Sequence, residues 1–118
     1  MLVVDDEPAI RLLCRVNLEL EGFRVLEAGN VDEARERLAA EDVGVVLVDV
    51  HIGPVDGRDF ARELRAHDPP RRVALLTGSI DLSAEEREGA DAVVYKPFTI
   101  DELVETVQRL SRAVDSSQ

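Results

Sequence analysis

The stretch VGVVLVD, residues 43–49, decides the fold of this sequence. It runs from Val43 to Val48 without a polar side chain and then closes on Asp49. A strand with one face in water alternates apolar and polar residues, whereas an unbroken apolar run is typical of a parallel strand covered on both faces. The stretch therefore predicts a buried central strand that ends in a carboxylate.

The segments on either side repeat this rhythm of short apolar runs and amphipathic stretches. We expect five strands, at residues 2–4, 23–26, 43–48, 73–76 and 93–95. We expect helices at residues 9–20, from Asn30, at residues 58–66, from Ser83 (a very short one) and from Thr99. Consecutive βα units with right-handed crossovers form an open, doubly wound parallel sheet with helices on both faces. The predicted fold class is α/β, in one domain over residues 1–112 with a polar, frayed tail at 113–118.

Local signals support the helices. Asn30, Ser83 and Thr99 each have a glutamate three residues later, which is the pattern of a capping box. Four apolar residues of the first helix recur at helical spacing: Leu12, Leu13, Val16 and Leu20. Gly22 suits the end of that helix.

The composition restricts the function classes. Among 118 residues, 25 acids stand against 14 bases, which gives a formal net charge of −11. Such a charge repels polyanions, so we expect no nucleic-acid binding by this chain. The single Cys14 excludes an internal disulfide and a cysteine metal cluster. The acids at positions 5–7 exclude a signal peptide, and the apolar runs are too short to span a membrane, so we expect a cytoplasmic protein.

Chemically active side chains stand where the predicted strands end. Open α/β sheets bind ligands at the carboxyl ends of their strands. Asp5 and Asp6 follow the first strand, Asp49 the third, Thr77 the fourth and Lys96 the fifth. We therefore expect these five side chains to meet in one cleft.

These residue types suit phosphoryl transfer. Three carboxylates repel one another unless a cation compensates, and Mg²⁺ takes carboxylate, water and phosphate oxygens as ligands. Lys96 supplies a positive charge for a phosphoryl oxygen, and Thr77 supplies a hydroxyl donor. Asp49 is the natural nucleophile, because aspartyl phosphates are established carboxylate chemistry.

Each residue alone has a simpler explanation. Asp5 and Asp6 would suit caps of the first helix. Asp49 alone would suit a solvated strand end, Thr77 a hydrogen-bonded turn, and Lys96 an exposed charge. Their occurrence together at four strand ends favours a shared site.

Four segments resemble the receiver domain of two-component response regulators, in order and over nearly the whole chain. They are Leu2-Val3-Val4-Asp5-Asp6-Glu7, Val46-Leu47-Val48-Asp49, Leu75-Leu76-Thr77-Gly78 and Lys96-Pro97-Phe98. The resemblance implies a flavodoxin-like (βα)5 sheet with strand order 2-1-3-4-5. It also implies that the chain is a signalling phosphoacceptor and not an enzyme. Such a phosphoacceptor hydrolyses its own phosphoryl group slowly. A sensor histidine kinase or a histidine phosphotransfer protein would load it, and a partner or output domain would read it.

The same resemblance implies a set of Mg²⁺ ligands. Asp6 would bind the ion directly and Asp5 largely through water. Asp49 and the backbone carbonyl of His51 would complete the set. In the family, side chains at the positions of His51 and Ser79 influence the lifetime of the phosphate, and we expect the imidazole to face solvent.

The resemblance also implies how the phosphoryl group would be held. It would form on Asp49, receive a hydrogen bond from Thr77 and pair with Lys96. Gly78 would keep the entrance to the site open.

The sequence departs from the family pattern in three places. An aromatic residue is usual three positions before the lysine, where this chain has Val93, and Tyr95 stands two residues later. We expect Val93 to pack in the core. The segment 77–89 is short by about one helical turn, which puts conventional dimerisation through the fourth helix in doubt. Gly53 stands where proline is usual and Pro54 follows, so we expect a locally altered turn.

Three other functions compete with this interpretation. A phosphatase of the haloacid dehalogenase type would want a second aspartate two residues after Asp49, where this chain has His51. A flavodoxin-like cofactor binder would want a glycine-rich phosphate loop after the first strand, where three acids stand. The serious alternative is a degenerate receiver that acts as a phosphorylation-independent interaction module. Val93 and the short fourth helix favour it, whereas the filled acceptor, metal and phosphate positions oppose it.

Overall fold

A computed structural model describes residues 1–67, 70–78 and 89–116 of the chain. The helix expected from Ser83 and the position of Ser79 lie outside these ranges. No helix within them is long and apolar enough to cross a membrane.

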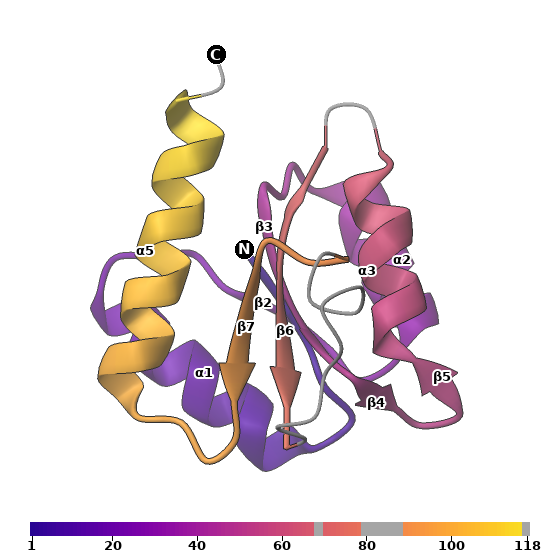
Figure 1. The fold of residues 1–118 in the computed structure, drawn as a ribbon, viewed down its shortest axis with the longest axis horizontal. Helices are drawn as coiled ribbons and strands as arrows, with labels where there is room; N and C mark the ends of the chain where they lie inside the picture. The colour runs from indigo at the N-terminus through magenta and orange to yellow at the C-terminus, as the bar shows by residue number, and fades with distance from the viewer. Residues whose placement is uncertain (68–69, 79–88, 117–118) are drawn as a thin grey trace.

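The centre of the molecule is a parallel sheet of five strands (Figure 1). In sheet order they are β2 (Leu26–Ala28), β1 (Leu2–Val4), β3 (Val45–Asp49), β6 (Arg72–Thr77) and β7 (Ala92–Tyr95). Counted along the chain, these five strands have the order 2-1-3-4-5. The doubly wound α/β fold is therefore confirmed.

Two layers of helices cover the sheet. α1 (Pro8–Leu20) and α5 (Ile100–Ser116) lie against one face, and α2 (Val31–Ala40) and α3 (Gly57–Arg65) lie against the other (Figure 1). Each strand divides its side chains between the two layers, because successive residues point to opposite faces. In β1, for example, Leu2 and Val4 pack in the cluster under α2 and α3, whereas Val3 packs under α1 and α5.

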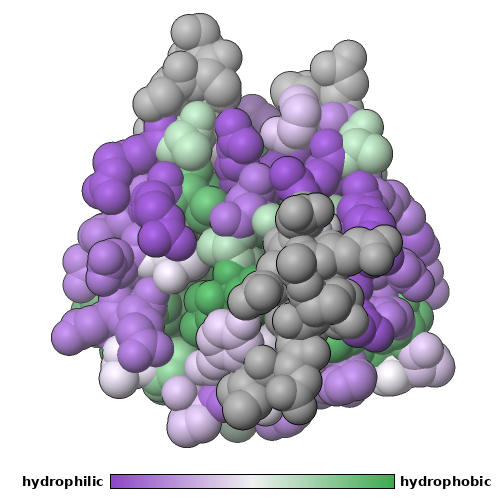
Figure 2. Space-filling model, in the orientation of Figure 1, coloured by the Kyte–Doolittle hydropathy of each residue, from purple (hydrophilic) through white to green (hydrophobic). Residues whose placement is uncertain are grey.

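The outer surface follows the same plan. Figure 2 shows hydrophilic residues over the outer faces of α5 and α3. The hydrophobic residues visible in this view lie mainly between these two helices, over β7. Most of the charged residues that make up a third of the chain are exposed or partly exposed, whereas Asp5 and Asp49 are buried.

Capping fixes where the helices begin, as the sequence predicts. The side chain of Asn30 accepts a hydrogen bond from the backbone N–H of Glu33 at 2.8 Å. Oγ1 of Thr99 accepts one from the N–H of Glu102 at 3.1 Å. α5 then continues through Ser116, into the segment expected to be frayed.

The first helix is confirmed, but the four residues whose spacing predicted it do not face the core. Leu12, Leu13, Val16 and Leu20 are between 41% and 78% exposed. The fully buried residues of α1 are instead Cys14 and Leu18. These two residues, one helical turn apart, lie on the opposite side of the helix from Leu12, Val16 and Leu20. The apolar positions therefore form two stripes, and sequence spacing alone reports only the more prominent one.

The second strand lies later than predicted, at Leu26–Ala28 instead of residues 23–26. The chain leaves α1 through Gly22, whose φ is +93°, and the N–H of Phe23 donates to the carbonyl of Leu18. Phe23 thus belongs to the turn that closes the helix. Pairing with β1 begins only at Leu26, which is level with Leu2.

The segment after β3 forms a small hairpin that the sequence presents only as turn-rich. β4 (His51–Ile52) pairs antiparallel with β5 (Val55–Asp56). Gly53, at the turn, has a φ of +58°, a left-handed conformation that glycine adopts without steric cost. Proline, whose φ is fixed at about −65°, could not adopt this conformation.

Candidate functional site

Three carboxylates lie together at the carboxyl edge of the sheet. Asp5 and Asp6 follow β1, and Asp49 is the last residue of β3. One oxygen from each carboxylate lies within 4.8 Å of the other two. Asp5 has no exposed surface and Asp49 is 6% exposed, whereas Asp6 is exposed. The structure thus brings together the three acids that the sequence places at these strand ends.

Lys96 brings an ammonium group to these acids from the end of β7. Its Nζ lies 3.1 Å from Oδ2 of Asp49 and 3.5 Å from Oδ2 of Asp5. Its backbone N–H donates to the carbonyl of Thr77 at 2.7 Å, which extends the β6–β7 pairing past Tyr95. The backbone of the sheet therefore determines where this positive charge lies.

Burial and charge shift the proton affinity of two of these groups. Burial raises the pKa of Asp5 to about 6; the N–H of Glu7, which donates to Oδ1, opposes the rise, and the charge of Asp49 adds to it. Burial lowers the pKa of Lys96, but the hydrogen bond to Asp49 and the charges of both acids outweigh it and hold the pKa above its usual value. One ammonium faces three carboxylates, so the pocket keeps an excess of negative charge.

Thr77 ends β6, the strand between β3 and β7. In the ladder, Asp49 is level with Leu76, and Thr77 is level with Tyr95. Thr77 is 2% exposed and stands at the sheet edge between the strands that carry the acid and the lysine. Gly78 follows it, and a Cβ built there would meet no atom of the described residues within 4 Å.

The loop after β3 holds two of the acids through its backbone. The N–H of His51 donates to Oδ1 of Asp49 at 3.1 Å. The N–H of Gly53 donates to Oδ2 of Asp6 at 3.0 Å. The imidazole of His51 is exposed, as expected from the sequence. The backbone of the hairpin thus determines the direction of the two carboxylates, while the side chain of Ile52 packs in the core and that of His51 faces water.

Two residues that support the site are missed by the sequence analysis. Gly57, the first residue of α3, donates its N–H to the carbonyl of Val50, and a Cβ built on it would overlap the backbone carbonyl oxygen of Asp49. Arg11 of α1 donates from Nη1 to the backbone carbonyl of Asp5 at 2.6 Å. No pattern within one segment indicates the role of Arg11, because its contacts form only where α1, β1 and β2 meet.

Val93 lies in the core rather than in the site. It is partly buried and packs against the cluster that contains Val48, Ile52 and Phe60. Tyr95 is two residues further along β7 and is partly exposed. The expectation that Val93 serves as core packing is therefore confirmed.

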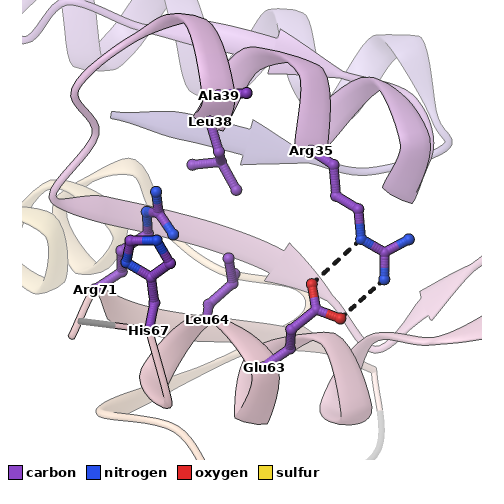
Figure 3. Close-up of a pocket in the computed structure, with 7 residues that line it drawn as sticks. All are labelled: Arg35, Leu38, Ala39, Glu63, Leu64, His67 and Arg71. Atoms are coloured by element: carbon purple, nitrogen blue, oxygen red, sulfur yellow. Dashed lines mark hydrogen bonds and ion pairs between the residues drawn. The ribbon is translucent and has the colours of Figure 1, made fainter. Parts of the chain in front are cut away.

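A separate hollow of about 240 Å³ lies between α2 and α3 (Figure 3). Leu38 and Leu64 face each other across it, and Arg35 forms a double hydrogen bond to Glu63 at one end. The guanidinium of Arg35 also lies 5.7 Å from the ring centre of Phe60. These contacts tie the two helices together, and the hollow contains none of the acids at the sheet edge.

The arrangement at the sheet edge has the chemistry of phosphoryl transfer. A buried carboxylate is within reach of a lysine, a threonine stands at the end of the neighbouring strand, and two further acids offer hard oxygen ligands. Catalysis of phosphoryl transfer consists mainly of positioning and charge neutralisation, which such a set can supply.

Comparisons of the sequence with a family model and with known proteins all point to one family. The family model of the response regulator receiver domain matches residues 1–108. The transcriptional regulatory protein AruR of Pseudomonas aeruginosa is 38% identical, over all of this chain and 51% of its own length. The transcriptional regulatory protein SrrA of Staphylococcus aureus is 34% identical, over 99% of this chain and 49% of its own length. This chain thus spans about half the length of these relatives.

Solved structures agree with the sequence relatives. The receiver domain of NtrX from Brucella abortus has a TM-score of 0.84 and 29% identity, with 92% of this chain and 95% of that chain covered. The response regulator TrrA from Thermotoga maritima, in complex with Mg²⁺–BeF, has a TM-score of 0.83 and 34% identity, with 92% and 96% covered.

Proposed function

Since this chain belongs to the response regulator receiver domain family, we propose that it accepts a phosphoryl group on Asp49 and acts as a signalling switch. The observation that carries the proposal is the 3.1 Å contact between Nζ of Lys96 and Oδ2 of Asp49 beside two further carboxylates. An ammonium in this position can pair with the oxygens of a phosphoryl group that forms on Asp49. Every other part of the proposal depends on this pair.

Mg²⁺ fits the residues present. It prefers hard oxygen ligands, and Asp5, Asp6 and Asp49 offer carboxylate oxygens within 4.8 Å of one another. The backbone carbonyl of His51 would complete the protein ligands. When bound, Mg²⁺ neutralises charge that the carboxylates and the phosphoryl oxygens bring together. The TrrA complex with Mg²⁺–BeF supports this assignment by similarity.

The transfer is a displacement at phosphorus. One Oδ atom of Asp49 forms the new O–P bond while the bond from phosphorus to the donor breaks, and the donor atom leaves with the electron pair. That donor atom is a histidine nitrogen of a phosphorylated protein or an oxygen of acetyl phosphate. In this proposal Lys96 holds its charge beside the phosphoryl oxygens, and Thr77 donates its hydroxyl to one of them.

Phosphorylation changes the charge of a buried group. A singly charged carboxylate becomes an acyl phosphate with about two negative charges at neutral pH. Thr77 and Lys96, on neighbouring strands, respond to that charge and bias an existing equilibrium between two states. A partner protein or an output segment reads the favoured state, and slow hydrolysis returns the domain to rest.

The phosphodonor is a histidine kinase or a histidine phosphotransfer protein in this proposal. α1 begins two residues after Asp6 and presents an exposed apolar stripe made of Leu12, Leu13, Val16 and Leu20. An exposed apolar stripe rimmed by polar residues is typical of a protein–protein contact. A donor protein seated there would bring its phosphohistidine to the adjacent acid cluster.

Two alternatives are less well supported. A dehalogenase-type phosphatase needs an acid two residues after Asp49, and there this chain has His51, whose imidazole is exposed. A degenerate receiver would have a broken site, whereas here three acids and Lys96 lie together at the sheet edge, with Thr77 at the end of the strand between them. The second alternative makes a distinct prediction, because it requires no phosphorylation.

Intact mass after incubation with acetyl phosphate tests the proposal. We expect a gain of one phosphoryl group that requires Mg²⁺ and disappears in Asp49→Asn. Asp32→Asn is a matched control, because Asp32 is an exposed acid of α2, and it should gain the group like the unsubstituted chain. No gain, together with no Mg²⁺ binding by calorimetry, would favour the interaction module.

A further inference from the structure

Arg11 connects three elements directly behind the acid cluster. It lies on α1, its Nη1 donates to the backbone carbonyl of Asp5 at 2.6 Å, and its Nε donates to Oε1 of Glu27 on β2 at 3.3 Å. The side chain is 19% exposed. The guanidinium therefore joins the helix, the end of β1 and the neighbouring strand at one point.

The carbonyl that Arg11 holds belongs to the peptide between two acids of the site. This peptide group is planar, so fixing the carbonyl of Asp5 also fixes the N–H of Asp6. The side chains are held separately, because Oδ1 of Asp5 accepts from the N–H of Glu7 and Oδ2 of Asp6 accepts from the N–H of Gly53. Arg11 thus supplies the backbone anchor that these two side-chain hydrogen bonds lack.

Gly29 leaves room for this anchor. It follows β2, and a Cβ built on it would lie 3.1 Å from Nη1 of Arg11, closer than most Cβ contacts. Its φ is not in the left-handed region, so the backbone itself would accept alanine. A methyl group at position 29 would therefore push the guanidinium aside by a few tenths of an ångström without removing any of its atoms.

We propose that Arg11, held by Glu27, is a positioning residue for the Mg²⁺ site. It fixes the Asp5–Asp6 peptide so that both carboxylates point at the ion before it binds. This inference rests on the proposed function and adds a residue outside the ligand set. Groups of this kind that orient metal ligands typically change metal affinity about 10- to 100-fold when removed.

Arg15 provides a matched comparison. It lies one turn after Arg11 on α1 and also pairs with Glu27, through Nη1 and Oε2 at 2.5 Å. Arg15 forms ion pairs with Glu19 and Glu27, whereas Arg11 also binds the backbone carbonyl of Asp5. If Arg11 only ties α1 to β2, then Arg15→Met and Arg11→Met should have the same effects.

Calorimetric titration of the full chain with Mg²⁺ tests the proposal. We expect Arg11→Met to raise the Mg²⁺ dissociation constant about tenfold. Arg15→Met should leave this constant within about twofold of the unsubstituted value. Arg11→Lys keeps a hydrogen-bond donor and should recover part of the lost affinity. Gly29→Ala should also raise the Mg²⁺ dissociation constant. It tests the same contact if Arg11→Met does not fold. Urea unfolding of each variant reports the structural effect separately.

Phosphorylation by acetyl phosphate gives a second measurement. Arg11→Met should raise the Mg²⁺ concentration for half-maximal rate, while the rate at saturating Mg²⁺ stays within about twofold. Equal Mg²⁺ dissociation constants for Arg11→Met, Gly29→Ala and the unsubstituted chain would overturn the proposed role of Arg11 but not the proposed function. Absence of Mg²⁺ binding by the unsubstituted chain would overturn the proposed function itself.

Discussion

The backbone of Gly57 lies so close to Asp49 that a Cβ at position 57 would overlap the carbonyl oxygen of Asp49. The N–H of Gly57 donates to the carbonyl of Val50 at 2.7 Å, so the start of α3 is held against the end of β3. The glycine needs no unusual φ here, because positive φ values occur only at Gly22 and Gly53 among the described glycines. Close approach is therefore the reason for this glycine.

Gly57→Ala should destabilise the fold and slow phosphorylation. The added methyl group forces α3 away from β3, and overpacking of this kind costs about 1–3 kcal/mol of the free energy of unfolding. Gly78→Ala is the control, because a Cβ there meets no atom within 4 Å, and it should change that free energy by less than about 0.5 kcal/mol. Urea denaturation measures both, and equal effects of the two substitutions would contradict the contact.

Lys96→Gln should separate metal binding from phosphoryl transfer. The substitution removes the ammonium beside Asp49 but none of the carboxylates that would bind Mg²⁺. We expect Mg²⁺ binding to persist and the rate of phosphorylation by acetyl phosphate to fall about 100-fold, as when one charge-stabilising donor is removed. Arg112→Gln, an exposed substitution on α5, should leave both unchanged. A normal rate in Lys96→Gln would exclude Lys96 from the transfer.

Leu18→Ala and Leu20→Ala should differ sharply in stability. Leu18 is fully buried, so truncation leaves a cavity and costs about 2–5 kcal/mol of the free energy of unfolding. Leu20 is 78% exposed, so truncation should cost less than about 0.5 kcal/mol. Thermal or urea unfolding distinguishes the two, and a large loss for Leu20→Ala would mean that the outer stripe of α1 is covered within the monomer.

The thiol of Cys14 should be inert in the folded protein. Burial, together with the nearby charge of Asp5, raises its pKa to about 12. The thiolate is the reactive form, so at pH 8 a thiol reagent should label the unfolded chain in urea and not the native one. The unfolded thiol ionises near pH 9. Stability should therefore be unaffected by this group below pH 9 and fall as the pH rises from 9 toward 12. Rapid labelling of native protein at pH 8 would contradict this burial.

The sequence predicts the sheet well because each core strand carries its own signal. The run that ends at Asp49 has to be covered on both faces, and the five βα units leave little choice of topology. The strand ends then bring Asp5, Asp49 and Lys96 together even though 47 residues separate the last two. Capping residues such as Asn30 also act locally, and their helix starts follow the prediction.

The features that the sequence does not predict depend on contacts between elements. On α1 the prominent apolar stripe faces outward, because the other side of the helix, with Ile10, Cys14 and Leu18, packs in the core cluster. β2 begins at Leu26 because the turn after α1 uses Phe23. Arg11 likewise acquires its role only when α1, β1 and β2 meet. Such information lies in packing and not in the periodicity of one segment.

The location of the phosphoryl group tests the central claim most directly. After incubation with acetyl phosphate and Mg²⁺, reduction with borohydride converts an aspartyl phosphate to homoserine, and peptide mass sequencing reports its position. We predict homoserine at position 49 alone, and none when Mg²⁺ is omitted. Homoserine at position 5 or 6, or a stable phosphoryl group on His51, would contradict the assignment of Asp49 as the acceptor.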